Sequence, residues 1–331
     1  MDTSLITKKL YNKSVQWKWE AMQKGVKQVK TYYDKVWDVS PLKEMEGDPA
    51  ILTSGVGPTY FEELNEKAPI KFVDPVEGYT VYLKRKDYAL GSETSMKLED
   101  DMAIVKIENF FKKYIQDTVS KSAEPTLDNE TAKIHLYGGY TSGHDVFDNS
   151  TKALATGYTK FVYDGKPFYS LTGTAHPKKG HSTTYINSLA NALTWDNAQT
   201  ADILFRVTNA VQENGRPLDM GDELAVMVPG ALGDKARVIF NTDRDPSTAN
   251  NGINPLKGRY EIIENPYLNL YPTQWYLQKK KCGLKMYVNK NPQIRFWVEE
   301  STRIIRCSCV ITAAFGVTSV AFSEGNNLAT S

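Results

Sequence analysis

The chain has 331 residues, which is enough for two or more packing units at roughly 100–200 residues per domain. Hydrophobic residues make up 41% of it and charged residues 24%, ordinary values for a globular protein that exclude wholesale disorder. Its 40 Lys and Arg residues nearly cancel its 39 Asp and Glu residues, so the large basic excess of a dedicated nucleic-acid binder is missing.

The N-terminal segment has the period of an amphipathic helix, and Pro41 ends it. Lysines such as Lys18, Lys24 and Lys27 occupy the positions between the apolar residues. One interpretation is a helix with a solvated basic face, and the other is an arm whose lysines contact a phosphate backbone. The apolar stripe needs a partner in both cases. It consists of Val15, Trp19, Met22, Val26, Val29, Tyr33 and Val36.

A strand-rich segment follows the predicted helix. Residues 51–69 contain the Gly55–Pro58 turn, which predicts a break in regular structure. Two strands are predicted at 70–73 and 79–83, and alternation in the second puts Val81 and Leu83 on the face opposite Tyr82 and Lys84. The charged run 84–87 is interpreted as the tip of this segment.

The longest predicted helix of the central chain runs from about Glu99 to Ser122. Acidic residues at its start and Lys121 near its end complement the helix dipole, and Pro125 is expected to stop it. A short helix is predicted at 129–140, ending at the Gly138-Gly139 pair. The apolar stripe of the long helix is Ile104, Ile107, Phe111, Ile115 and Val119.

The second half of the chain mixes helices with separate groups of strands. Asp164-Gly165 predicts a turn between two strands within 158–170. Thr194 is a predicted N-cap of a helix that ends at Gly215. The pattern is that of an α+β protein and not of a regularly alternating α/β enzyme. Further strands are predicted at 224–228, 260–263, 273–277, 285–288, 293–299 and 304–314, and a helix at 231–240.

The cysteines predict buried thiols and no disulfide framework. Their number is odd and the chain is long, which is typical of a reduced protein. Cys307 and Cys309 lie two apart in an apolar β-like run, so they should share one buried face of a strand. With no secretory signal and no stretch of about 18 apolar residues, the sequence predicts a soluble protein made in the cytoplasm.

Motifs of catalysis and cofactor binding are missing from the sequence. It has no P-loop, no dinucleotide fingerprint, no zinc-ligand spacing and no nucleophile elbow, so we predict neither an enzyme, nor a metal site, nor a cofactor. His144-Asp145 could form half of a hydrolytic triad, and His176 could act as a base. A soluble hydrolase that uses these residues therefore remains an alternative.

Five short motifs occur in a fixed order along the chain: Asp164–Tyr169, Ala175–Pro177, Asn214–Leu218, Leu224–Pro229 and Thr312–Gly316. Each is weak alone. In this order, over roughly Leu52 to Phe322, the sequence resembles the major capsid proteins of tailed bacteriophages, most closely the Mu-type major head subunits.

The resemblance implies the Hong Kong 97-type capsid fold, an α+β architecture with an N-terminal arm, an E-loop, a spine helix, a peripheral domain and an axial domain. It places the arm at 1–69, the E-loop at 70–98, the spine helix and peripheral domain at 99–221, the axial domain at 222–285 and the return to the peripheral domain at 286–331. Within the family, the E-loop reaches over an adjacent subunit.

The implied function is structural: a subunit that assembles with itself into pentamers and hexamers of an icosahedral head enclosing double-stranded DNA. The implied location is the virion, assembled in the host cytoplasm. Portal and scaffolding or decoration proteins are implied partners, with DNA contacted non-specifically and no membrane. An encapsulin-like compartment shell is the alternative with the same architecture. The candidate residues are Tyr82, Lys84, Arg85 and Lys86 for contact between subunits, and Lys18, Lys24 and Lys27 for DNA.

Overall fold

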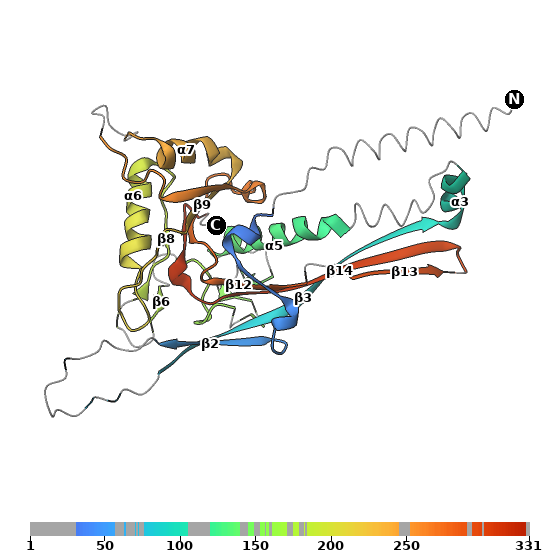
Figure 1. Ribbon diagram of the computed structural model, residues 1–331, viewed down its shortest axis with the longest axis horizontal. Helices are drawn as coiled ribbons and strands as arrows, with labels where there is room; N and C mark the ends of the chain where they lie inside the picture. Colours follow the sequence, from blue (N-terminus) through green and yellow to red (C-terminus); the bar gives the residue numbers. More distant parts are fainter. Residues whose placement is uncertain are drawn as a thin grey trace. The chain divides into compact units, whose positions relative to one another are not determined.

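The protein is described by a computed structural model, shown in Figure 1. It describes residues 31–56, 63, 70, 72, 76–104, 120–139, 145–148, 153–155, 157–158, 161–170, 175–178, 182, 184–244, 252–289, 293–299 and 301–328. The chain divides into two compact units. Unit 1 comprises Met1–Thr31, Lys86–Asp128 and Val288–Ala313, and unit 2 comprises Tyr32–Arg85, Asn129–Tyr287 and Ala314–Ser331.

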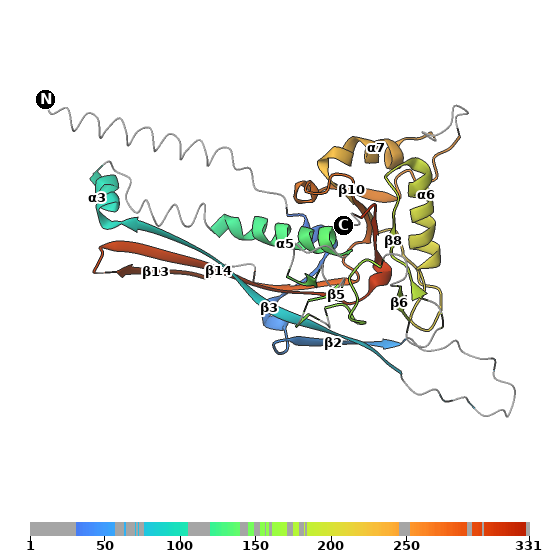
Figure 2. The same ribbon diagram turned by 180° about the vertical axis from the view of Figure 1, so that it is seen from behind.

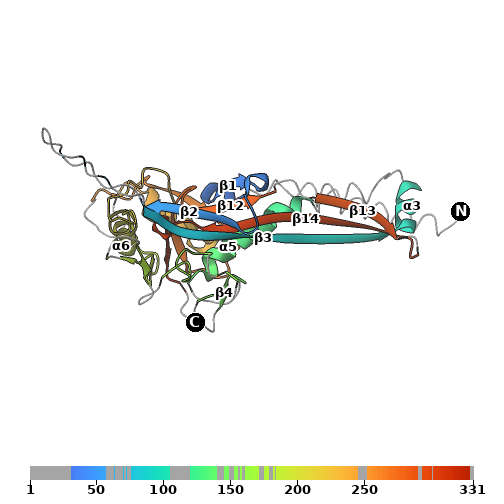
Figure 3. The ribbon, with the colours of Figure 1, turned by 90° about the horizontal axis from the view of Figure 1, so that it is seen from below.

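The largest sheet has six strands in the order β1-β12-β14-β3-β2, with β13 paired to β14 off this path. Figure 3 shows β3 and β14 running side by side. At 20 and 14 residues, both are longer than the usual strand of about 3–10 residues. The bounds are β1 Asp38–Pro41, β2 Ala50–Val56, β3 Val76–Ser95, β12 Leu284–Val288, β13 Gln293–Glu299 and β14 Ile304–Val317.

Unit 1 contains the antiparallel pair of β13 and β14, in register from Gln293 opposite Val310 to Glu299 opposite Ile304. Cys307 and Cys309 are buried on this pair, against Ile294 and Ile305, as free thiols. The predicted buried cysteines on one strand face are thus confirmed. The helix α3 (Met96–Ile104) follows β3, and its first turn is capped by Ser95, whose Oγ accepts from the backbone N–H of Leu98 at 3.2 Å.

Unit 2 contains a five-stranded sheet in the order β10-β9-β11-β15-β8. Every residue of β9 is buried, with β10 parallel on one side and β11 antiparallel on the other. The helices α6 and α7 pack into the same apolar core as these strands (Figure 2). The bounds are β8 Ser188–Leu189, β9 Leu224–Val228, β10 Tyr260–Glu264, β11 Trp275–Lys279, β15 Ser323–Asn326, α6 Trp195–Ile203 and α7 Gly233–Asn241.

The remaining elements are short. Two-residue strands form the pairs β4–β5 and β6–β7. Tyr33 and Val36, the last two residues of the predicted N-terminal stripe, are buried in α2, whereas residues 1–30 lie outside the described residues. The bounds are α2 Tyr33–Val36, η1 Leu42–Glu44, η3 Ser120–Ser122, β4 Phe147–Asp148, β5 Ala153–Leu154, β6 His176–Pro177, β7 Thr184–Tyr185, η4 Leu204–Thr208, η5 Gly230–Leu232, η6 Pro266–Leu268 and η7 Val320–Phe322.

The charged run 84–87 is not a tip, and residues 50–56 are not a break. β3 runs without a break through 84–87 to Ser95 because β14 lies beside it in the sheet, whereas its pairing with β2 reaches only as far as Leu83. β2 pairs with β3 on both sides of Gly55, and the register of the pairing shifts between Thr53 and Gly55. Opposite this shift, a Cβ on Gly78 would lie 2.3 Å from the Oγ of Ser54, so only glycine fits there.

Pro125 does not stop a helix; it lies in the first turn of one. The helix α5 spans Ala123–Tyr137, and Pro125 sits in its first turn, where a backbone N–H has no partner within the helix to lose. The end predicted at Gly138-Gly139 is confirmed, since α5 ends at Tyr137, but the helix starts six residues before the predicted position 129. A Cβ on Gly138 would lie 2.7 Å from the carbonyl oxygen of Ile134. The predicted spine helix from Glu99 to Ser122 starts within α3, and residues 105–119 lie outside the described residues.

The α6 prediction is confirmed at its start and wrong at its end. Thr194 caps α6, because its Oγ1 accepts from the backbone N–H of Asn197 at 3.3 Å. The helix widens into the π-helical segment η4 and ends there; Gly215 instead closes a separate turn with Gln212. The strands predicted around Asp164-Gly165 are not formed in residues 161–170, although the turn itself is. The strands predicted from residue 224 onward and the 231–240 helix are confirmed within a few residues at each end. The strand predicted at 79–83 is part of the longer β3. In the strand predicted at 70–73, residues 70 and 72 are not in a strand, and residues 71 and 73 lie outside the described residues.

A glutamate lies inside the core of unit 2. Glu324 in β15 is fully buried; its Oε1 accepts from the side-chain amide of Asn326 at 3.1 Å, and its Oε2 has no partner among the described residues. Burial, together with the nearby negative charge of Asp202, raises the pKa of Glu324 to about 8. The carboxyl is therefore mainly protonated at neutral pH.

The stability of the protein should fall with rising pH because of this group. The unfolded chain releases the proton above its ordinary pKa of 4.5, whereas the folded chain holds it up to about pH 8. The free energy of unfolding should thus drop between these values by up to about 1.4 kcal/mol per pH unit. Glu324→Gln should remove this slope in urea unfolding measured from pH 5 to 8.5. An unchanged slope in the variant would contradict the assignment.

Candidate assembly surface

The burial of Val81 and Leu83 determines which side chains of β3 are exposed. Val81 and Leu83 are buried, and a Cβ on Gly316 would lie 2.8 Å from the Cδ1 of Leu83, so the two segments touch closely. Because alternate side chains of a strand point to opposite faces, Tyr82 and Lys84 are exposed. The predicted alternation is confirmed.

Three of the four predicted contact residues, Tyr82, Lys84 and Arg85, line one cavity, which we call the β3 pocket. Its volume is about 370 Å³. The Nζ of Lys84 lies 5.3 Å from the ring centroid of Tyr158, and the backbone N–H of Arg85 donates to Oδ1 of Asp48 at 3.2 Å. Lys86 follows on the same strand, in unit 1, and is partly buried. The full lining is Asp48, Pro49, Tyr82, Lys84, Arg85, Gly157, Tyr158 and Phe161.

Unit 1 exposes large apolar side chains on its strands. We call Leu90, Trp297 and Val298 the arm patch; each is 47–49% exposed. Trp297 and Val298 are consecutive in β13 and therefore point to opposite faces, so neither face of this strand end is covered. Nearby, Arg306 binds both Glu93 at 3.0 Å and Glu299 at 2.6 Å, exposed ion pairs of small energetic weight.

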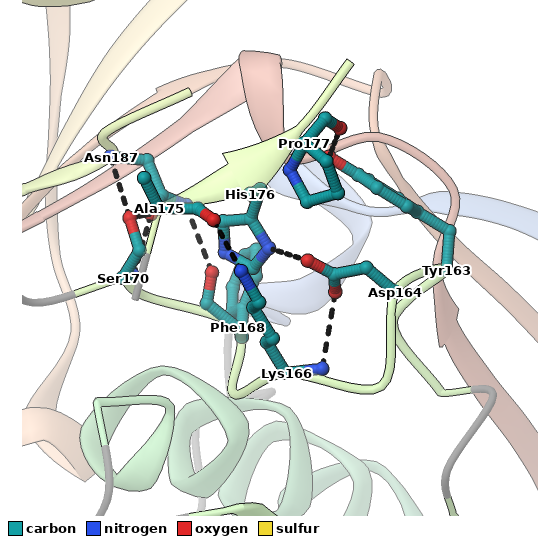
Figure 4. Close-up of polar contacts among 9 residues, drawn as sticks. All are labelled: Tyr163, Asp164, Lys166, Phe168, Ser170, Ala175, His176, Pro177 and Asn187. Carbon is teal, nitrogen blue, oxygen red and sulfur yellow. Dashed lines mark hydrogen bonds and ion pairs between the residues drawn. The ribbon is translucent and has the colours of Figure 1, made fainter. Parts of the chain in front are cut away.

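The first two motifs of the sequence come together in unit 2, as Figure 4 shows. The Nδ1–H of His176 donates to Oδ2 of Asp164 at 2.8 Å, and both side chains are buried. The other carboxylate oxygen accepts from the backbone N–H of Lys166 at 3.1 Å, and the Nζ of Lys166 donates to the carbonyl of Ala175 at 2.5 Å. These contacts join the Asp-Gly-Lys turn to the Ala-His-Pro segment.

A second buried network continues from the same turn. The backbone N–H and the hydroxyl of Ser170 both donate to Oδ1 of Asn187, at 2.8 and 3.0 Å. The side-chain amide of Asn187 donates to the carbonyl of Phe168 at 2.9 Å. Such contacts satisfy buried backbone groups outside regular structure, which is the role of a structural motif.

His135 lies in an aromatic cluster of unit 2 and is fully buried on α5. Its Nδ1 is 2.7 Å from the hydroxyl of Tyr169, which is 3.1 Å from the Oγ of Ser323. Burial lowers the pKa of His135 to about 3, so the ring is neutral. Nothing in the sequence singled out this histidine, because its partners come from distant segments.

The geometry gives no support to hydrolysis. His176 pairs with a carboxylate as a triad histidine does, but it is 0% exposed, so a substrate cannot reach its Nε2. Asp145 accepts from the hydroxyl of Tyr158 at 3.3 Å, and His144 lies outside the described residues.

Other kinds of site were also predicted or excluded from the sequence. Within the described ranges, no group of three or more His, Cys, Asp or Glu residues could hold a metal ion. Nor is any helix there long and apolar enough to cross a membrane. The DNA-facing candidates Lys18, Lys24 and Lys27 lie outside these ranges.

Comparison of the whole chain with known proteins gives similarity only at the level of structure. No family model and no curated protein matches the sequence. The structure is similar to one from Mycobacterium phage Patience, with a TM-score of 0.54 and 11% identity over 99% of this chain and 86% of that chain. It is also similar to the capsid structure of cyanophage P-SCSP1u, with a TM-score of 0.53 and 11% identity over 93% and 90% of the two chains.

A third similar structure is the capsid of a native GTA particle with C5 symmetry, at a TM-score of 0.50 and 13% identity over 92% and 93% of the two chains. The chain has the Hong Kong 97-type phage capsid fold. The fold implied by the five ordered motifs is thereby confirmed. The likeness to the Mu-type head subunits in particular, the domain boundaries and the contact residues stay predictions.

Removing Asp164 should destabilise this fold. Asp164→Ala would leave the Nδ1–H of His176 buried without an acceptor and free the backbone N–H of Lys166, at a cost of about 2–4 kcal/mol. Asp164→Asn keeps an acceptor oxygen and should cost less. Urea unfolding of both variants measures the difference. A loss below about 1 kcal/mol for Asp164→Ala would contradict a structural role for the motif.

Proposed function

We propose that the chain is the major capsid subunit of a tailed bacteriophage, which assembles with itself into pentamers and hexamers of an icosahedral head around double-stranded DNA. The observation that carries the proposal is the fold, which the chain shares over more than nine-tenths of its length with solved phage and GTA capsid structures. Such a function needs no catalytic site, in keeping with the burial of His176.

The exposed surface of unit 1 supports self-assembly. The arm patch presents three large apolar side chains, one on β3 and two on β13, and β13 has a hydrogen-bonded neighbour on only one side among the described strands. An uncovered apolar strand edge is a template for pairing with another chain. Because a closed shell repeats the same few contacts many times, modest free energies per contact add up to a stable particle.

The remaining parts of the proposal follow from the role of a head subunit. The virion is its location, after assembly in the host cytoplasm, and portal and scaffolding or decoration proteins are its partners. Contact with DNA would be non-specific, through lysines such as Lys18, Lys24 and Lys27, since phosphates attract lysine whatever the base sequence.

The chain expressed alone should form rings of five and six subunits or closed shells. Light scattering followed by negative-stain electron microscopy measures this. The contents of purified particles then separate two shells of the same architecture, because nucleic acid identifies a virus-like head and a single cargo protein identifies an encapsulin-like compartment. A monodisperse monomer at every concentration would contradict self-assembly.

The arm patch should be needed for this assembly. Trp297→Lys introduces a charge that would be desolvated in an apolar contact, so assembly should require a roughly tenfold or greater increase in protein concentration. Thermal unfolding of the unassembled chain should hardly change, because Trp297 is 47% exposed there. Trp297→Phe is the matched control and should assemble normally. Equal assembly of both variants would show that the patch lies outside the contacts.

A further inference from the structure

The β3 pocket carries two cations that have no counter-ion in the described part of the chain. Asp48 is the one acidic residue among the lining residues, and its Oδ1 accepts a hydrogen bond from the backbone N–H of Arg85. Lys84 and Arg85 are exposed, and neither side chain forms an ion pair with a described residue. The charge of the pocket is therefore available to a group from outside.

The walls of the pocket are aromatic. Tyr82, Tyr158 and Phe161 line it together with the two cations. A volume of about 370 Å³ accommodates one or two side chains and lies at the lower end of ligand-site volumes. Such a site suits a segment that offers one apolar side chain and one carboxylate close together.

A segment of that kind is present in α3. Leu98 is 39% exposed, and Asp100 is exposed without an ion pair among the described residues. The surrounding sequence, Lys97-Leu98-Glu99-Asp100-Asp101, has three acids and one base, and so carries a net charge of −2 at neutral pH. Its charge is opposite to that of the pocket, and its apolar residue matches the aromatic walls.

We infer that the β3 pocket is the docking site for α3 of a second copy, with Asp100 beside Lys84 and Leu98 against the aromatic walls. The inference rests on the proposed self-assembly and names one of its contacts. Because two different surfaces meet, the contact is head-to-tail, and a head-to-tail contact closes into a ring when its rotation allows. Charge complementarity at such a contact selects the partner and fixes its register.

The test reverses the two charges separately. Lys84→Glu and Asp100→Lys each place like charges together, so each should raise the protein concentration needed for rings or shells by about tenfold. Lys235→Glu is the matched control, since Lys235 is an exposed lysine on α7, outside the pocket, and should assemble like the unaltered chain. Circular dichroism and thermal unfolding of the unassembled variants check that each one is folded.

Mixing the two defective variants then decides whether the contact joins different copies. In an alternating ring, Glu at position 84 of one chain meets Lys at position 100 of the next, and the unaltered Lys84 of the second chain meets the unaltered Asp100 of the first. The mixture should therefore form six-membered rings or sheets of them at concentrations where neither variant does alone. Recovery only when both changes are in one chain, and not in the mixture, would place the contact within a single chain and overturn the inference.

Other outcomes also separate the possibilities. If Lys84→Glu lowers binding of a short DNA duplex and Asp100→Lys leaves assembly unchanged, the pocket is a nucleic-acid site and the inference is wrong. If the unaltered chain assembles and both charge reversals assemble equally well, the inference fails while the proposed function stands. Failure of the unaltered chain to assemble under any condition would instead count against the proposed function itself.

Discussion

The surface of β3 depends on one close contact, that between Leu83 and Gly316. A side chain at position 316 would collide with Leu83, so this glycine leaves room for the side chain of Leu83 beside the backbone of β14, the neighbouring strand of the sheet. Since the side chains of a strand alternate, fixing Val81 and Leu83 inward fixes Tyr82 and Lys84 outward. The last of the five sequence motifs, which contains Gly316, thus acts on residues more than 200 positions earlier in the chain.

In the first two of the five ordered motifs, the polar side chains form hydrogen bonds with other buried groups of the protein. Asp164, Lys166 and His176 tie two irregular segments together, and Ser170 and Asn187 serve the backbone around them. Segments without a hydrogen-bonded ladder must find partners for their backbone elsewhere, and side chains supply them. In the sequence, such residues resemble the polar residues of a catalytic site. The structure distinguishes the two cases, because catalytic residues must be accessible to a substrate, whereas His176 is buried.

The elements that the sequence predicted well are those whose pattern is local. The run Leu224–Val228 reads as a buried strand because all five residues are apolar, and Thr194 reads as a cap because capping involves only the next turn. The errors arise where a distant partner overrides the local signal. The charges at 84–87 predict an exposed tip, but these residues continue β3, which has β14 beside it. Pro125 predicts the end of a helix, but α5 begins two residues before it. The contact surface could not be located for the same reason, because a pocket is made by segments from three parts of the chain.

The distribution of buried apolar residues connects the fold to assembly. Most fully buried apolar side chains belong to unit 2, whereas the described strands of unit 1 bury a small group around Cys307 and Cys309 and expose the arm patch. A strand pair with so little core gains little from its own packing, since hydrophobic stabilisation scales with the apolar area removed from water. Covering the patch with a second copy would supply area that the single chain lacks. Unit 1 would then reach its full stability only in the assembly, because binding of a neighbouring copy to the folded state stabilises that state.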